Sequence, residues 1–381
     1  MQRSGIYILI ASVLGLIVLG VVMLFSTSAF AQDSHGDIYY FVKRQMFWLG
    51  IGAGACVLGA LVDHARWKAF WPWICGLSFL LLVLCFVPHV GMRINGSARW
   101  IHAGSLTFQP SEAAKIAALF FLAWWFSRPE TDPGKFLHGF VIPGAVILSL
   151  VAPIAAEVDL GTTALIVAMA LALCYVGGAN GAVILAFFGT GLAGLIGIAM
   201  LIPERYARLA SFLHPENDQL GKGLQQWQAL IAFGSGGIEG LGLGNGRQKL
   251  LYLPYAHTDF IFPMIGEELG LLATWAVVFC FILIILSGGL VASNAKDKFG
   301  KLLASGILLL ISLQAAVNIG MTTSLLPNKG MPLPFISYGG SNLAVSLFMI
   351  GILVNIHRTG IPVAPLPERH VVLAARSVPR I

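Results

Sequence analysis

Ten apolar runs divide this chain, and they decide what it can fold into. A helix needs about 20 predominantly apolar residues to cross a bilayer, and most of these runs approach that length. Only 10% of the residues are charged, against about 25% in a typical soluble protein. This excludes a cytosolic enzyme, a disulfide-rich secreted module and a nucleic-acid-binding protein. The sequence predicts an all-α polytopic membrane protein with about ten transmembrane helices, over residues 6–25, 45–62, 70–87, 111–126, 138–155, 160–176, 182–201, 268–290, 302–325 and 338–357.

The first run also has features of a secretory signal peptide. Arg3 precedes it, and Ala29-Phe30-Ala31 fits a cleavage site of small residues. However, the run is longer than the usual apolar region of about 7–15 residues, and it is long enough to span a membrane. We therefore expect a retained helix.

The basic residues predict how the helices are oriented. An even number of spans places both termini on one side, and the short segments on that side hold twelve Lys and Arg against five on the other. Cytoplasmic segments carry the excess of positive charge, so both termini are predicted to be cytoplasmic. Residues 1–358 then form one transmembrane domain with a large outer loop, about 202–267, between helices 7 and 8. Residues 359–381, with several prolines and scattered charge, are expected to form a flexible cytoplasmic tail.

The outer loop contains a glycine-rich run, 234–249, that ends in Arg247-Gln248-Lys249. A nucleotide-binding loop does not fit, because Asn245 stands where the third glycine of G-x-G-x-x-G is required and no G-K-[ST] follows. What remains is a backbone that can approach a ligand closely, followed by two cations suited to phosphate oxygens. We predict that Arg247 and Lys249 bind substrate; the alternative is a solvated loop face.

Asp259 lies where the outer loop returns to an apolar run. Desolvation is expected to raise its pKa towards the range of a general base. His257, two residues earlier, could orient the carboxylate or share its proton. The alternative for both is an outer-surface residue satisfied by water. A Ser-His-Asp hydrolase is not favoured, because no serine lies in a nucleophile-elbow setting.

A second outer segment carries Arg93, Asn95 and Arg99 and leads into Glu112 and Lys115. The last two are three residues apart and share a helical face. Charges within a membrane span are costly, so this pair is expected to face an internal cavity. The alternative is an ion pair that only joins helices.

A third outer segment, 326–342, contains Lys329 and Ser337 among three prolines. Its backbone must be buried in protein or line a wet cavity, which predicts a re-entrant loop or broken helix at a site. Glu157 and Asp159 flank a short outer turn; acids at helix starts also serve as plain caps.

Two kinds of site have no support in the sequence. The five cysteines lie inside apolar runs and are expected to be small buried hydrophobes. No Cys/His cluster or metal-ligand spacing is present. A divalent cation, Mg²⁺ or Mn²⁺, stays open as an aid to phosphate chemistry.

Taken together, the blocks at 93–115, 157–163, 205–268 and 326–342 closely resemble the SEDS family of shape, elongation, division and sporulation proteins. The most specific motifs are AHTDFIF, GSGG followed by GLGNGRQK, and PLPFISYGGS. The chain resembles the cell-division branch, FtsW, more than the elongation branch, RodA. Two residues depart from the family pattern: Tyr255 replaces Glu or Arg, and Val158 replaces Pro.

The resemblance implies a peptidoglycan glycosyltransferase of the bacterial cytoplasmic membrane, at the division septum. It would polymerise lipid II at the outer face, together with a class B penicillin-binding transpeptidase and other divisome or elongasome proteins. Asp259 matches the essential aspartate of the family. The family's conserved positions in the second segment fall on Arg93, Asn95, Arg99, Glu112 and Lys115.

The residues and the resemblance lead to the same mechanistic hypothesis. A lipid-linked donor keeps its lipid in the bilayer and its diphosphate at the outer interface. Asp259 would take the proton of the acceptor sugar hydroxyl, and the departing diphosphate would be stabilised by cations chosen from Arg93, Arg99, Lys115, Arg247 and Lys329. Two rivals stay open: a flippase that moves lipid II without chemistry, and a divisome scaffold. Costly charges in the membrane argue against a pure scaffold.

Overall fold

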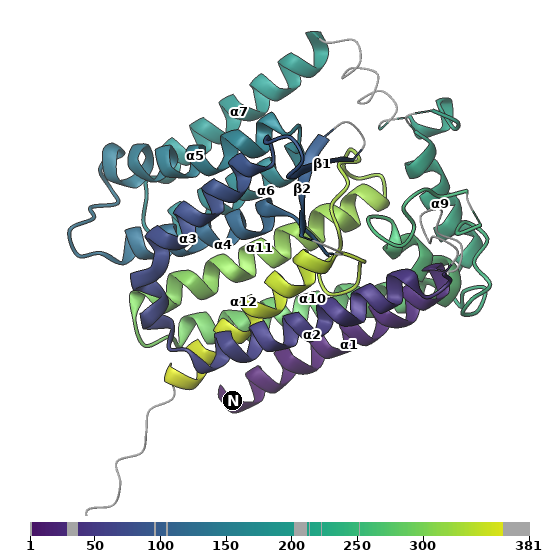
Figure 1. The fold of residues 1–381 in the computed structure, drawn as a ribbon, viewed down its shortest axis with the longest axis horizontal. Coiled ribbons are helices and arrows are strands. Elements are labelled where there is room, and N and C mark those ends of the chain that lie inside the picture. The colour runs from purple at the N-terminus through teal and green to yellow at the C-terminus, as the bar shows by residue number, and fades with distance from the viewer. Residues whose placement is uncertain are drawn as a thin grey trace, which may run out of the picture.

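The computed structural model describes residues 2–360 except 29–36, 95–96, 104–105, 202–211, 213, 222 and 251. All ten predicted apolar runs are helical (Figure 1). These helices are α1 (Gln2–Ser28), α2 (Tyr40–Leu61), α3 (His64–Leu84), α4 (Pro110–Ser127), α5 (Ile142–Ala156), α6 (Leu160–Val176), α7 (Gly181–Leu201), α10 (Ile261–Ser293), α11 (Lys298–Thr322) and α12 (Gly340–Gly360). A short π-helix, η1 (Leu137–Val141), leads into α5.

Helix length and composition support a membrane-spanning protein. Seven helical segments in the described part of the chain are long and apolar enough to cross a bilayer. They are α1, α2, α3, η1 with α5, α10, α11 and α12, and the shorter α6 and the start of α7 are also apolar. The predicted all-α polytopic membrane fold is confirmed.

The segment predicted as a large outer loop is partly helical. It contains a 3-10 turn, η2 (Pro215–Asn217), and an amphipathic helix, α9 (Leu224–Gly236). α10 begins at Ile261, earlier than the predicted 268, and its helical geometry is interrupted at Gly270, where φ is 77°. A non-glycine residue rarely adopts this conformation, so Gly270 marks the boundary between the outer part of α10 and its apolar span.

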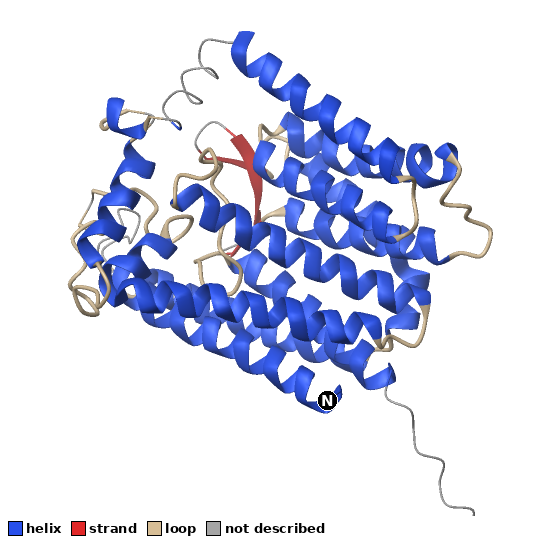
Figure 2. Cartoon of the chain, turned by 180° about the vertical axis from the view of Figure 1, so that it is seen from behind, coloured by secondary structure: helices blue, strands red, loops and turns tan. Residues whose placement is uncertain are grey.

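A three-stranded antiparallel sheet lies between α3 and α4, in the second outer segment, where the sequence did not predict strands (Figure 2, red). Its strands are β1 (Gly91–Ile94), β2 (Ser97–Ala103) and β3 (Leu106–Phe108), in the order β1-β2-β3. Met92 pairs with Trp100 and Arg93 with Ala98, which leaves Arg99 as the extra residue of a β-bulge. A bulge bends the strand and redirects the side chain it carries.

Close helix contacts build the core around α12 and α10. Gly59 and Gly351 bring the backbones of α2 and α12 together; a Cβ on Gly351 would lie 2.1 Å from the carbonyl oxygen of Cys56. Small residues permit this approach between membrane helices. α1 packs along α10 with Leu9 and Met23 fully buried. All five cysteines are free thiols, buried or half-buried in this packing.

The connections of the helices gather at two ends of the bundle. The sheet, α9 and the loop before α10 lie at one end, to which the right-hand end of α1 also runs in Figure 1. By the predicted orientation this is the outer end. The start of α1 and the end of α12 lie at the opposite end.

Candidate functional site

Asp259 lies in the loop that directly precedes α10, at the outer end of the bundle. Its backbone carbonyl accepts a hydrogen bond of 2.9 Å from the Asn318 side-chain amide, and the same amide donates to the Met331 carbonyl at 2.6 Å. Its half-buried carboxylate lies against Gly330; a Cβ there would be 3.0 Å from Asp259 Oδ2. Gly330 has φ of 59°. This position therefore requires glycine both for its backbone and for the space beside the carboxylate.

The β-bulge brings Arg99 to the same place. Its guanidinium donates a hydrogen bond of 2.9 Å to the Val158 carbonyl, in the turn between α5 and α6. The Arg99 charge also acts on the Glu157 and Asp259 carboxyls, since it lowers the pKa of both. A loop, a strand and a helix turn far apart in the sequence thus converge on one site.

The turn between α5 and α6 contributes two acids with different surroundings. Asp159 is the N-cap of α6: its carboxylate accepts from the Thr162 backbone at 3.1 Å and from the Thr162 hydroxyl at 2.9 Å. This is the capping role that acids at helix starts commonly have. The Glu157 side chain is buried, and its Oε1 has no hydrogen-bond partner among the described residues. Between them, Val158 has φ of 63°, an unfavourable backbone conformation for a β-branched residue.

Burial sets the proton affinity of this site. Desolvation, reinforced by the Asp159 charge and opposed by Arg99, raises the pKa of Asp259 to about 6. Desolvation also raises the pKa of Glu157 to about 7; the Cys85 thiol and Arg99 oppose the rise, and Asp159 adds to it. Asp259 is therefore mostly ionised at neutral pH and still basic enough to accept a proton. We call Arg99, Glu157, Asp159, Asp259 and Gly330 the aspartate site.

The proline-containing segment 326–339 covers one side of the aspartate site. The backbone of Lys329 lies against the start of α6, because a Cβ on Gly161 would be 3.2 Å from the Lys329 carbonyl oxygen. Lys329 is thus adjacent to both Asp259 and the Asp159 cap. Ser337 lies deeper: its hydroxyl is buried and accepts a hydrogen bond of 2.8 Å from the Leu333 backbone. Ser337 accordingly stabilises the turn in the structure.

Glu112 and Lys115 form a buried ion pair of 2.8 Å in the first turns of α4. Lys115 also donates to Gln314 at 3.0 Å, and Gln314 in turn donates to the Pro332 carbonyl at 2.9 Å. Asn342 of α12 donates to Glu112 at 3.1 Å. The pair is buried within the bundle and connects α4, α11 and α12 to the proline-containing segment.

The glycine-rich run folds back onto the outer part of α10. Glu268 is fully buried and accepts from Lys249 at 2.6 Å, from the Gly244 backbone at 2.8 Å and from Ser26 at 2.8 Å. Glu267 accepts from the backbones of Arg247 and Gln248. We call Ser26, Gly244, Lys249, Glu267 and Glu268 the glycine-loop cluster.

This geometry changes the interpretation of the glycine-rich run. A Cβ on Gly240 would be 2.4 Å from the Glu268 carbonyl oxygen, so its glycines permit close approach to α10. The Lys249 ammonium is buried within the cluster, where it also donates to Ser26 and the Gly244 carbonyl. Lys249 thus forms a buried ion pair with Glu268, and its contact with substrate stays a prediction. The Arg247 side chain is exposed.

The remaining predicted residues lie beside the site or outside the described residues. The His257 ring packs on Phe41 with centroids 4.3 Å apart, and its carbonyl accepts from the Tyr338 backbone at 3.0 Å. The backbone of Arg93 pairs in β1, and Asn95 lies outside the described residues. Among the side chains that the structure describes, no group of three or more His, Cys, Asp and Glu could hold a metal ion.

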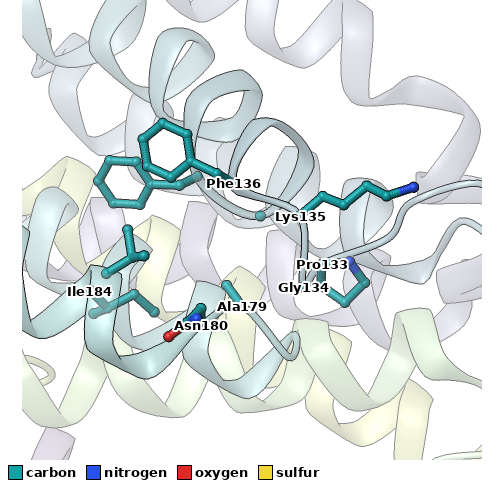
Figure 3. A pocket seen from close by; sticks show the side chains of 10 residues that line it. Pro133, Gly134, Lys135, Phe136, Ala179, Asn180 and Ile184 are labelled. Carbon is teal, nitrogen blue, oxygen red and sulfur yellow. The ribbon is translucent and has the colours of Figure 1, made fainter.

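Figure 3 shows a small cavity of about 80 Å³ that lies apart from the aspartate site. It lies between the start of η1 and the turn before α7, at the opposite end of α5 and α6 from Asp159. Phe136 and Ile184 line it, and the Lys135 ammonium points away from it. Its lining residues include no acid or arginine of the kind found in the aspartate site.

Sequence reasoning did not find Asn318, Gln314 or the β-bulge at Arg99. The two amides carried a signal, because they are polar residues inside the apolar run 302–325 and lie four residues apart on one helical face. The bulge depends on strand pairing between residues that the sequence did not mark as strands.

Comparison with known proteins agrees with this architecture. A sequence model of the cell cycle protein family, FtsW/RodA/SpoVE, matches residues 7–360. Stage V sporulation protein E of Bacillus subtilis is 38% identical over 94% of this chain and 98% of its own length. A probable peptidoglycan glycosyltransferase FtsW of Geobacter metallireducens is 38% identical over 93% of this chain and 95% of its own.

One solved structure that the fold resembles has a TM-score of 0.76 and 26% sequence identity, over 92% of this chain and 97% of the other. It comes from a study of the structural coordination of polymerization and crosslinking by a peptidoglycan synthase complex. The predicted family resemblance is confirmed. This multi-pass membrane protein belongs to the FtsW/RodA/SpoVE family of cell cycle proteins.

Proposed function

We propose that this protein is a peptidoglycan glycosyltransferase that polymerises lipid II at the outer face of the bacterial cytoplasmic membrane, with Asp259 as general base. The observation that carries the proposal is the half-buried Asp259 carboxylate, which lies against Gly330 at the outer end of the bundle and interacts with the Arg99 charge. Related proteins are named as probable peptidoglycan glycosyltransferases, which supports the same reaction class.

The chemistry needs a base and a cation. Asp259 takes the proton from the acceptor sugar hydroxyl while that oxygen forms a bond to the anomeric carbon of the donor. The bond from that carbon to the diphosphate oxygen breaks, and the diphosphate leaves on its lipid. Diphosphate is stable as an anion, so no second acid is required, unlike in glycoside hydrolysis. One displacement inverts the anomeric centre.

Arg99 and Lys329 are our first candidates to stabilise the diphosphate, because both adjoin Asp259. Arg93 and Arg247 remain candidates from the outer segments. Lys115 and Glu112 act through Gln314 on the proline-containing segment, and His257 and Ser337 support the loops beside the base.

We infer a class B penicillin-binding transpeptidase as partner and the division septum as location. The similarity to a structure from a synthase complex that couples polymerization with crosslinking supports such a partner. Residues 359–381 are then a cytoplasmic tail of the single transmembrane domain.

The test is polymer formation from labelled lipid II by purified protein, with and without the transpeptidase, read on a gel. Asp259→Asn should lower the rate by about 10²–10⁴-fold, the usual contribution of a general base. The wild-type rate should rise with pH through about 6, because the raised pKa of Asp259 leaves its carboxyl protonated below that value.

The matched control is Glu239→Gln, which neutralises an exposed acid of the same outer region and should leave the rate within about twofold. Full activity of Asp259→Asn would refute the general base. A flippase would be the better assignment if the purified protein formed no polymer and loss of Asp259 left glycan synthesis intact in cells supplied with precursor from outside.

A further inference from the structure

The turn between α5 and α6 holds a buried acid that the reaction above does not use. The Glu157 side chain is 3% exposed, and its Oε1 has no hydrogen-bond partner in the described part of the chain. Arg99 is only partly buried, but its Nε atom is inaccessible to solvent and has no partner there either. An unsatisfied buried polar atom costs about 1–3 kcal/mol. An acceptor and a donor left unpaired in one site indicate a second arrangement in which they meet.

The groups around Glu157 come from three elements. The Cys85 thiol at the end of α3 hydrogen-bonds its carboxyl, Arg99 of β2 attracts it, and Asp159 repels it. Asp259 is subject to the same attraction by Arg99 and the same repulsion by Asp159. Arg99 is thus shared between two carboxyls. In the described arrangement its guanidinium is held by the Val158 carbonyl, at 2.9 Å, and by neither acid.

We propose that Glu157 is a positioning residue that controls where the Arg99 guanidinium lies through its own protonation. This rests on the proposed function. Protonated Glu157 leaves Arg99 on the Val158 carbonyl, facing the side where the diphosphate departs. Ionised Glu157 draws the guanidinium into a direct Nε–Oε1 ion pair and away from the substrate. The proton that Glu157 loses goes to solvent, and no covalent bond changes.

The two acids then limit the reaction in opposite directions, Asp259 at low pH and Glu157 at high pH. Burial raises the pKa of Asp259 to about 6 and that of Glu157 to about 7. The base works only when ionised, so the rate increases as pH rises through about 6. Arg99 is available only while Glu157 is protonated, so the rate decreases as pH rises through about 7. The expected profile is a narrow bell.

The experiment measures lipid II polymerisation by the purified full-length protein from pH 5 to pH 9, for wild type and Glu157→Gln. Glutamine keeps the shape of the side chain but cannot ionise. The ratio of the Glu157→Gln rate to the wild-type rate should rise about tenfold between pH 6 and pH 8, because a group titrates over about one pH unit on either side of its pKa. Glu157→Asp, which keeps the acid, should retain a decline above neutral pH.

A purely structural role for Glu157 predicts something different. Glu157→Gln would then lower the rate by the same factor at every pH, and that result would overturn the proposal. If Glu157→Gln does not fold, the wild-type profile decides: a decline centred near pH 7 supports the switch, and a flat rate from pH 7 to pH 9 overturns it. Either failure would leave the general-base assignment standing, because Asp259→Asn tests that separately.

Discussion

The outer end of this protein contains two clusters of buried acids that differ in how completely they are satisfied. In the glycine-loop cluster, Glu268 accepts hydrogen bonds from an ammonium, a hydroxyl and a backbone amide. In the aspartate site, Glu157 Oε1 and Arg99 Nε lack partners within the described residues. Well-satisfied polar networks fix a structure, whereas unpaired buried groups are tolerated where a site has chemistry to perform.

The backbone shows the same contrast. The positions with positive φ in the glycine-rich run are glycines, at Gly237, Gly240, Gly242 and Gly244. Near the aspartate site such positions also fall on Val158 and Tyr255, which are poorly suited to them. Strain of this kind costs about 1–3 kcal/mol per residue and is concentrated at functional sites. Folding stability is therefore expected to depend on the first cluster and catalysis on the second.

The largest expected effect comes from breaking the glycine-loop cluster. Lys249→Met leaves the Glu268 carboxylate buried without its cation and should lower the stability by about 3–5 kcal/mol. Thermal unfolding of the purified protein in detergent measures this. Lys249→Met with Glu268→Gln removes both charges and should restore most of the stability and the rate. A double variant that is stable but inactive would instead support the predicted contact between Lys249 and substrate.

The second largest effect is expected from Asn318, whose amide links the Asp259 loop to the proline-containing segment. Asn318→Leu removes the amide that holds Asp259 and Met331 and leaves two carbonyls unsatisfied, at a cost of about 1–3 kcal/mol for each. A shift of the base by about 1 Å should reduce kcat by about 10²-fold with little change in KM.

Asn355→Leu is the matched control for this variant. Asn355 is also fully buried and also donates its amide to a carbonyl, that of Ala60, but it lies at the other end of α12. It should lose similar stability and keep its rate per folded molecule. Equal losses of kcat in both variants would argue against a positioning role for Asn318.

The smallest expected effect tests the strain at the aspartate site. Val158 is 61% exposed, so its replacement sacrifices little packing. Val158→Asn should raise the stability by about 1 kcal/mol, because asparagine tolerates the left-handed conformation better than a β-branched residue does. Val158→Ala should gain less. No rise in melting temperature for Val158→Asn would mean that the turn stores no strain.

These two clusters also show what the sequence could predict. The helices were predictable, because apolar length is a local property of the chain. Asp259 and Arg99 were predictable as candidates, because ionisable residues beside apolar runs are rare and costly. The partner of Lys249 was not: Glu268 lies 19 residues away, across a glycine-rich fold whose shape depends on tertiary contacts. The bulge at Arg99 and the amide of Asn318, 59 residues from Asp259, were hidden for the same reason.

The side-chain amide of Asn318 in α11 donates hydrogen bonds to two carbonyls, those of Asp259 and Met331. The loop that carries the proposed base and the proline-containing segment are consequently attached to the same residue of α11. A change in the position of α11 would therefore displace the base and the proline-containing segment together, not one without the other.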